Sequence, residues 1–128
     1  MNRIFQLFEM SKIEYYHLDF LHNEFILEVN NDLFGLQKAI FKEVSTFYFI
    51  HDQSESRKKI YSPYLYKDLE TSDIGLLNQN VTIRLISDSI DWVSEYSGGG
   101  NIFIEIWDQL LILEAKRVSI NGIEYILT

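Results

Sequence analysis

The sequence predicts a mainly β fold in a single domain, residues 1–128, with an α+β fold as the alternative. Two observations favour strands: several runs alternate apolar with polar residues, and an Asn-Gly pair lies between two β-rich runs near the C-terminus. Helical patterns are few, and 47% hydrophobic residues suffice for a packed core. We therefore expect a single antiparallel sheet, a sandwich or a partly open barrel, with one or two short helices and a C-terminal β-meander.

The first expected element is a short amphipathic helix over residues 2–10, laid on the sheet. Its apolar residues recur at helical spacing: Ile4, Phe5, Leu7 and Phe8. Two later segments, residues 67–79 and 88–96, are each long enough for a turn or two of helix.

Antiparallel strands are expected in most of the remaining chain, because its runs are β-rich or alternate between apolar and polar residues. The runs are residues 12–18, 23–30, 38–52, 81–87 and 101–107. The first two lie on either side of a short connection, "DFLH". Each run could bury one face, which in the last would carry Ile102, Ile104 and Ile106.

The strongest local signal is Asn121-Gly122. A type I′ turn needs positive φ at both central residues, and Asn-Gly tolerates this best. A closing hairpin should therefore pair the 118–120 run with the 123–125 run, and residues 110–115 should run beside residues 101–107.

Three consecutive glycines, residues 98–100, raise the question of a phosphate-binding loop. Such a loop needs a following helix, whose N–H groups meet the anion, and usually a lysine or hydroxyl at set spacing. Here a β-rich run follows, no lysine is present, and Asp91 and Glu95 would repel phosphate. We therefore expect the glycines to connect two elements of the chain.

Charge and composition limit the classes of partner that the protein could bind. The net charge is −8, and the segment from Asp68 to Asp108 holds eight acids and one base, which gives −7 there. The basic cluster "SESRKK" is short, so neither a nucleic acid nor an anionic membrane is an expected partner. With no cysteine, the chain has no disulfide or thiolate metal site and suits a reducing cytoplasm.

A metal site is the second hypothesis for the segment around "HLDFLH". His17, Asp19 and His22 are residue types that bind zinc, but no fourth ligand is indicated. We expect these residues to lie in a solvated turn, and we expect no metal or other cofactor.

No catalytic arrangement is recognisable. No serine lies in a nucleophile elbow, and nineteen acids supply carboxylate pairs by chance. We therefore expect a protein without catalytic residues and keep a small enzyme as a further alternative.

An acidic and aromatic segment is the best candidate for a partner-binding surface. In a helix, its side chains would fall three and four residues apart on one face: Asp88, Asp91, Trp92, Glu95 and Tyr96. Aromatic anchors among acids supply contact energy and steering toward a basic partner. The alternative is that Trp92 and Val93 dock inward and the acids only solvate the outside.

The runs "YYHLDFLHNEFILEVNN" and "NIFIEIWDQLLILEAKRVSINGIEYI", in a small acidic β-rich chain, resemble bacterial immunity proteins of polymorphic toxin systems. The resemblance implies a non-catalytic cytoplasmic inhibitor that binds one cognate toxin, such as a basic toxin domain, and blocks its active site. The other hypotheses are a β domain that binds a small molecule or a metal, and an uncharacterised small enzyme. Homo-oligomerisation is left open.

Overall fold

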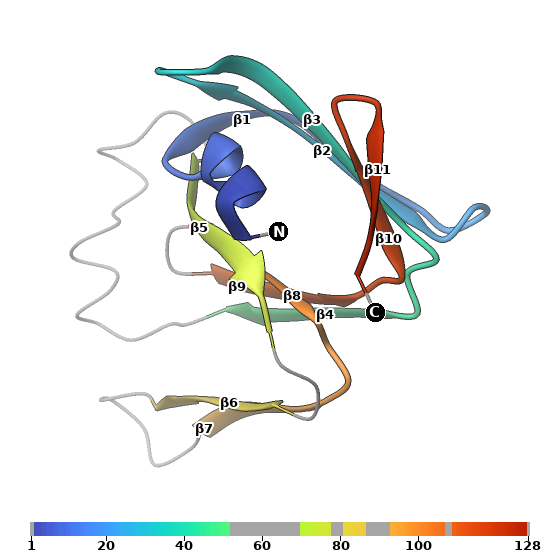
Figure 1. The fold of residues 1–128 in the computed structure, drawn as a ribbon. Helices are drawn as coiled ribbons and strands as arrows, with labels where there is room; N and C mark the ends of the chain where they lie inside the picture. The colour runs from blue at the N-terminus through green and yellow to red at the C-terminus, as the bar shows by residue number, and fades with distance from the viewer. Residues whose placement is uncertain (1, 52–69, 78–80, 87–92, 107–108, 128) are drawn as a thin grey trace.

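The computed structural model describes residues 2–51, 70–77, 81–86, 93–106 and 109–127, and their fold is mainly β, as predicted (Figure 1). The elements are η1 (Asn2–Phe8), β1 (Ser11–Asp19), β2 (Glu24–Asn31), β3 (Gly35–Lys42), β4 (Thr46–His51), β5 (Glu70–Leu76), β6 (Val81–Ile86), β7 (Val93–Gly98), β8 (Ile102–Ile106), β9 (Gln109–Glu114), β10 (Arg117–Ile120) and β11 (Ile123–Ile126). Within these residues, no helix is long and apolar enough to cross a membrane.

The strands form one large and one small sheet. Nine strands pair antiparallel in the order β11-β10-β3-β2-β1-β5-β8-β9-β4, and β6 pairs with β7 in a separate hairpin. The predicted strands at residues 12–18 and 23–30 are confirmed as the β1–β2 hairpin. The expectation of a single sheet therefore holds for the main sheet, to which the structure adds a second, two-stranded one.

The large sheet folds over on itself at a corner. The alternating run at residues 38–52 breaks after Lys42, because Glu43 adopts a φ of 52° and β4 begins at Thr46. The chain between β9 and β10 bends at the same place, where the Ser45 N–H donates to the Glu114 carbonyl (2.9 Å) and the Lys116 N–H to the Lys42 carbonyl (3.2 Å). Hence β3 pairs with β10 on one side of the corner and β4 with β9 on the other.

The C-terminal hairpin forms as predicted. Asn121 and Gly122 both have positive φ, 52° and 88°, and Val118 pairs with Tyr125. The other predicted hairpin is also present, as β8–β9. The predicted β-meander is therefore two hairpins, which the corner separates in the strand order.

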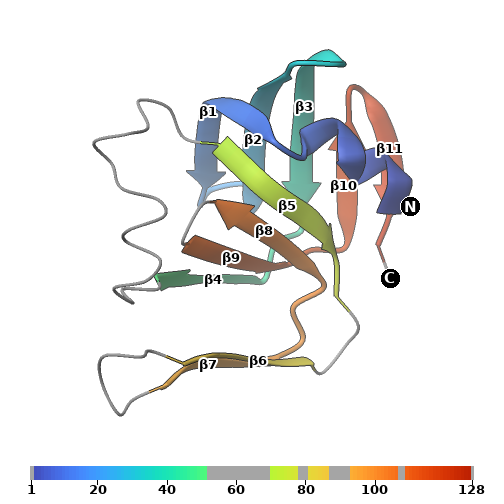
Figure 2. The same cartoon turned by 90° about the vertical axis from the view of Figure 1, so that its left-hand side faces the viewer.

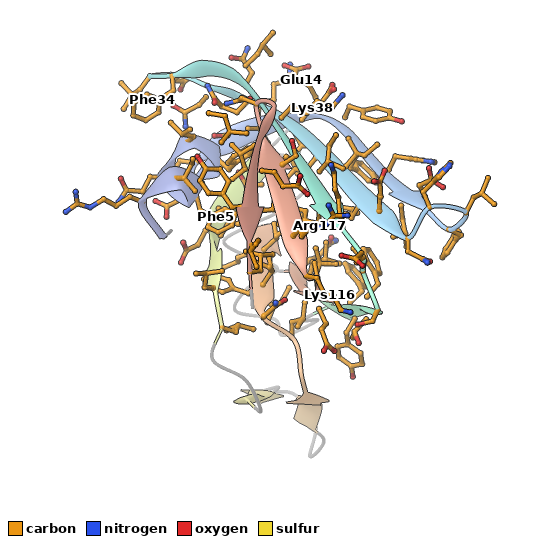
Figure 3. All side chains as sticks on the ribbon, turned by 45° about the vertical axis from the view of Figure 1, so that its right-hand side comes forward. Phe5, Glu14, Phe34, Lys38, Lys116 and Arg117 are labelled. Carbon is orange, nitrogen blue, oxygen red and sulfur yellow. The ribbon has the colours of Figure 1, made fainter. Side chains whose placement is uncertain are left out.

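The hydrophobic core lies between the two halves of the folded sheet, which cross steeply in Figure 2. The predicted N-terminal helix is present as the 3₁₀ helix η1, and Phe5 and Phe8 bury fully against the sheet. Ile102 and Ile104 are buried as predicted, and Ile106 is partly buried. Figure 3 shows the charged side chains of Lys38, Lys116 and Arg117 on the outer side of the strands.

Two helical expectations are wrong in the residues that the structure describes. Residues 70–76 of the segment 67–79 form β5, and residues 93–96 of the segment 88–96 belong to β7; the rest of both segments, except Leu77, lies outside the described residues. The reason is pairing, because β5 is hydrogen-bonded to β8 and β7 to β6. Neighbouring strands decide the conformation where local helix preference is weak.

Candidate functional site

The glycine run is a structural connection and no phosphate loop. It leads from β7 directly into the strand β8, so no helix N-terminus follows. The Asn101 side chain holds it in place: its amide donates to the Ala115 carbonyl (2.7 Å) and its oxygen accepts from the Ala115 N–H (3.0 Å). A Cβ on Gly99 would lie 3.1 Å from the Glu114 carboxylate. The prediction that the glycines connect two elements is confirmed.

The histidine and aspartate candidates build a turn. One carboxylate oxygen of Asp19 accepts from the backbone N–H groups of Leu21 (3.0 Å) and His22 (3.1 Å), and the other lies 2.8 Å from His22 Nδ1. The hydrogen bond lowers the pKa of Asp19 and raises the pKa of His22. The ring of His17 instead stacks on Tyr15, with centroids 6.3 Å apart. Among the described residues, no three His, Asp or Glu side chains are placed to hold a metal ion.

The predicted acidic and aromatic surface falls mostly outside the described residues, which include neither Asp88, Asp91 nor Trp92. Glu95 and Tyr96 lie in β7, where their Cα partners are Arg84 and Ile83. A helical face through these last two residues is therefore wrong. The five-residue grouping itself stays a prediction.

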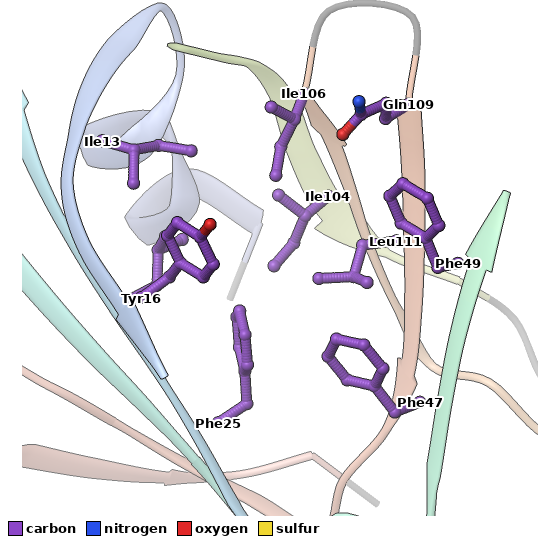
Figure 4. Close-up of a pocket in the computed structure, with 10 residues that line it drawn as sticks. Ile13, Tyr16, Phe25, Phe47, Phe49, Ile104, Ile106, Gln109 and Leu111 are labelled. Atoms are coloured by element: carbon purple, nitrogen blue, oxygen red, sulfur yellow. The ribbon is translucent and has the colours of Figure 1, made fainter. Parts of the chain in front are cut away.

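A cavity of about 250 Å³ opens between the two halves of the large sheet (Figure 4). In the described part of the chain, β1 pairs with β5 through Ser11 and Lys12, and the cavity lies between β1 and β2 on one side and β4, β8 and β9 on the other. The described residues that line it are Ile13, Tyr16, Phe25, Leu27, Phe47, Phe49, Ile104, Ile106, Gln109 and Leu111. We call this cavity the apolar pocket.

The apolar pocket has a tight floor and an open aromatic rim. Phe25, Leu27, Ile104 and Leu111 expose 5% of their surface or less, so they form a closely packed floor. The rings of Tyr16, Phe47 and Phe49 are much more exposed and form the rim. The open space therefore lies above the floor, between the rim side chains.

Polar groups enter the apolar pocket at few points. Among the described residues that line it, none has a charged side chain, and Tyr16 and Gln109 are the two with polar side-chain atoms. In Figure 4 Gln109 lies beside Ile106 at one end, and Phe25 and Phe47 lie at the other. A guest would meet apolar surface almost everywhere and a neutral amide at one end.

An exposed hydrophobic turn adjoins the pocket. Phe47 also lines a shallow groove shared with Phe20, in the turn between β1 and β2. Phe20 and its neighbour Leu21 are 83% and 85% exposed, although Asp19 holds their turn in a defined conformation. We call Tyr16, Phe20, Leu21, Phe47 and Phe49 together the open-side strip. The signal for it was in the sequence, since "DFLH" puts two large apolar residues where a turn ordinarily has small or polar ones.

Comparison with known proteins gives a family. A family model described as YxiG-like protein matches residues 1–125 of this chain. Among curated proteins, none matches.

Proposed function

The chain belongs to the YxiG-like protein family, and we propose that it is a non-catalytic protein-binding module. In its sharper form, the proposal is an immunity-type inhibitor that binds a cognate bacterial toxin in the cytoplasm and occludes the toxin's active site. The resemblance of its β-rich runs to immunity proteins supports the sharper form.

The observation that carries the proposal is the open-side strip. Monomeric proteins seldom expose contiguous apolar patches unless the patch has a partner. Two strip residues, Phe20 and Leu21, lie in a turn that the Asp19 carboxylate closes with hydrogen bonds to backbone N–H groups. Because this turn is already ordered, little conformational entropy is lost when a partner covers it.

Charge supplies the second part of the proposal. The segment from Asp68 to Asp108 carries a net charge of −7, which would attract a basic toxin domain. In the proposal, Asp88, Asp91 and Glu95 steer the encounter, while Trp92 and Tyr96 add contact surface. Long-range attraction acts mainly on the association rate, whereas the apolar contacts act on dissociation.

The test begins with co-expression of the chain and the product of the adjacent gene, followed by measurement of both rate constants. Replacing Asp88, Asp91 and Glu95 with their amides should slow association by about tenfold at low salt and flatten its salt dependence. Dissociation should change less. An unchanged association rate would remove the acidic segment from the proposal.

A second candidate, a β domain that binds a small molecule, is favoured by the apolar pocket and its volume of about 250 Å³. The two candidates give different results in purification. Recovery of a specific small molecule and of no protein partner would refute the inhibitor and favour the second candidate.

A further inference from the structure

We infer that the apolar pocket receives one aromatic side chain of the partner protein, a tyrosine or a tryptophan. The inference rests on the proposed function, because it names the chemistry of the partner's central contact. The pocket adjoins the open-side strip through Phe47, Phe49 and Tyr16, which belong to both.

The size of the pocket fits an aromatic ring. An apolar cavity of roughly 150 Å³ is enough to bind benzene. The apolar pocket, at about 250 Å³, has room for a phenol or an indole above its packed floor. Its walls come from β1, β2, β4, β8 and β9, all parts of the same sheet, so the site is formed before a partner arrives.

The chemistry of the lining selects among side chains. A charged guest would lose its water without meeting an opposite charge from the described lining, which holds no Asp, Glu, Lys, Arg or His. A purely aliphatic guest would leave the Gln109 amide without a partner at the closed contact. Tyrosine and tryptophan combine a flat apolar body with one polar atom, which matches an apolar ring of side chains with an amide at one end (Figure 4).

The rim is arranged for aromatic contacts. The rings of Phe25 and Phe47 lie 5.5 Å apart with a tilt of 52°, so they already support each other. A ring placed between Phe47 and Tyr16 would add further tilted contacts of the kind that aromatic pairs prefer. Buried tyrosine and tryptophan side chains are also the residues that most often dominate binding energy at protein interfaces.

The first experiment uses side-chain analogues and needs no partner. Toluene, p-cresol, indole and benzoate are titrated into the full chain while the methyl NMR signals of Ile104 and Leu111 are followed. We expect p-cresol to bind about 2- to 10-fold more tightly than toluene, as one net hydrogen bond would give, with indole comparable and benzoate much weaker. No binding of p-cresol and indole, or equal affinity for p-cresol, toluene and benzoate, would overturn the inference.

A double variant tests the polar end. Gln109→Leu combined with Tyr16→Phe should bring the affinity ratio of p-cresol to toluene down to about one, because both polar side chains of the described lining are gone. The matched control is Gln6→Leu with Tyr15→Phe, which makes the same two changes outside the apolar pocket and should leave the ratio unchanged. A ratio that survives in the double variant contradicts the assignment of the polar end.

The second experiment separates this inference from the proposed function. Ile106→Phe should fill the pocket and weaken binding of the co-purified partner by at least about tenfold. If this variant lowers the melting temperature, Gln109→Phe fills the same end of the pocket instead, because Gln109 lies beside Ile106 (Figure 4). A partner that binds the filled variant as tightly as the natural chain overturns the inference and leaves the proposed function standing. Failure to obtain any protein partner, with the analogues still bound, overturns both and assigns the pocket to a small molecule.

Discussion

The two turns at opposite ends of β2 are built alike and held differently. The β1–β2 turn begins with Asp19 and the β2–β3 turn with Asn31, and in each a side-chain oxygen accepts from two backbone N–H groups of the turn. Each turn ends on a residue with positive φ, Asn23 at 53° and Gly35 at 78°. Each also presents large apolar residues to solvent.

The two turns differ in what the side chain of their first residue contacts outside the turn. Asn31 is buried, and its amide also donates to the Glu9 carbonyl (2.9 Å) and to Ser11 Oγ (2.8 Å), which ties its turn to the end of η1. Among the described residues, the Asp19 carboxylate is hydrogen-bonded only within its own turn, to Leu21 and His22. The β2–β3 turn is therefore anchored to the rest of the fold through Asn31. The β1–β2 turn exposes Phe20 and Leu21 without such an anchor, so changing these two residues should have little effect on stability.

The largest expected effect is on stability, and it contrasts a buried phenylalanine of η1 with an exposed phenylalanine of the β1–β2 turn. Phe5 of η1 is fully buried and stacks on Phe41 with centroids 6.5 Å apart, so Phe5→Ala should cost about 3–5 kcal/mol. Phe20 is 83% exposed, and Phe20→Ala should change stability by about 0.5 kcal/mol or less. Urea unfolding of both variants checks this, and equal costs would show that the β1–β2 turn is packed like the core.

The next effect sharpens the contrast between the turns themselves. Asn31→Ala removes a buried amide, so the Ser11 hydroxyl loses a donor and two turn N–H groups lose their acceptor, and the change should cost about 2–3 kcal/mol. Asp19→Ala, the matching change in the exposed turn, should cost clearly less. Thermal unfolding of the pair gives the order, and the reverse order would contradict the account of the two turns.

A smaller effect is the pH dependence of the exposed turn. The Asp19 carboxylate raises the pKa of His22, so protonated His22 stabilises the fold. This stabilisation is complete below the ordinary pKa of 6.5 and is lost as the pH rises through the pKa of His22 in the folded protein. His22 lowers the pKa of Asp19, so ionised Asp19 stabilises the fold. This stabilisation is present above pH 3.8 and is lost as the pH falls through the pKa of Asp19 in the folded protein. An NMR titration should show His22 titrating above 6.5 and returning toward that value in Asp19→Asn. An unchanged pKa of His22 in this variant would contradict the pairing of His22 with Asp19.

The smallest effect lies beside Asn31. Burial, and then the charge of Asp73, raise the pKa of Glu9, so the ionised form destabilises the fold at pH values above its folded pKa. Glu9→Gln should therefore raise the free energy of unfolding at pH 7 by about 0.5 kcal/mol or less, which thermal unfolding would show as a slightly higher melting temperature. Near pH 3, where Glu9 is neutral, the variant should make no difference. A loss of stability at pH 7 would contradict the repulsion between Glu9 and Asp73.

The parts of the fold that sequence reasoning reached are those with local signals. The β1–β2 strands alternate or are β-rich on both sides of a turn, and Asn121-Gly122 specifies its own hairpin through positive φ. The β3–β4 corner carries no such signal, since the alternation runs on through Lys42 to Thr46 without a glycine or proline. Glu43 takes its positive φ there because β10 and β9 pair on either side of the bend.

The candidate site divides in the same way. The exposed turn could have been recognised from "DFLH", because the apolar pair interrupts a predicted connection. The apolar pocket could not, because its described lining comes from five strands that are far apart in the sequence, β1, β2, β4, β8 and β9. The strand β5 was also missed, because helical turns were expected in residues 67–79. Strand separation is set by contacts between distant segments, which periodicity does not report.

The measurement that tests the central claim most directly compares Leu21→Asp with Leu33→Asp in affinity for the co-purified partner. The two leucines are 85% and 86% exposed in the corresponding turns, and each change adds one negative charge, so folding and net charge are matched. If the open-side strip is the binding surface, Leu21→Asp should weaken binding by about 30-fold or more, and Leu33→Asp by less than about twofold. Equal effects, or a larger loss with Leu33→Asp, would contradict the account and move the binding surface to the other end of β2.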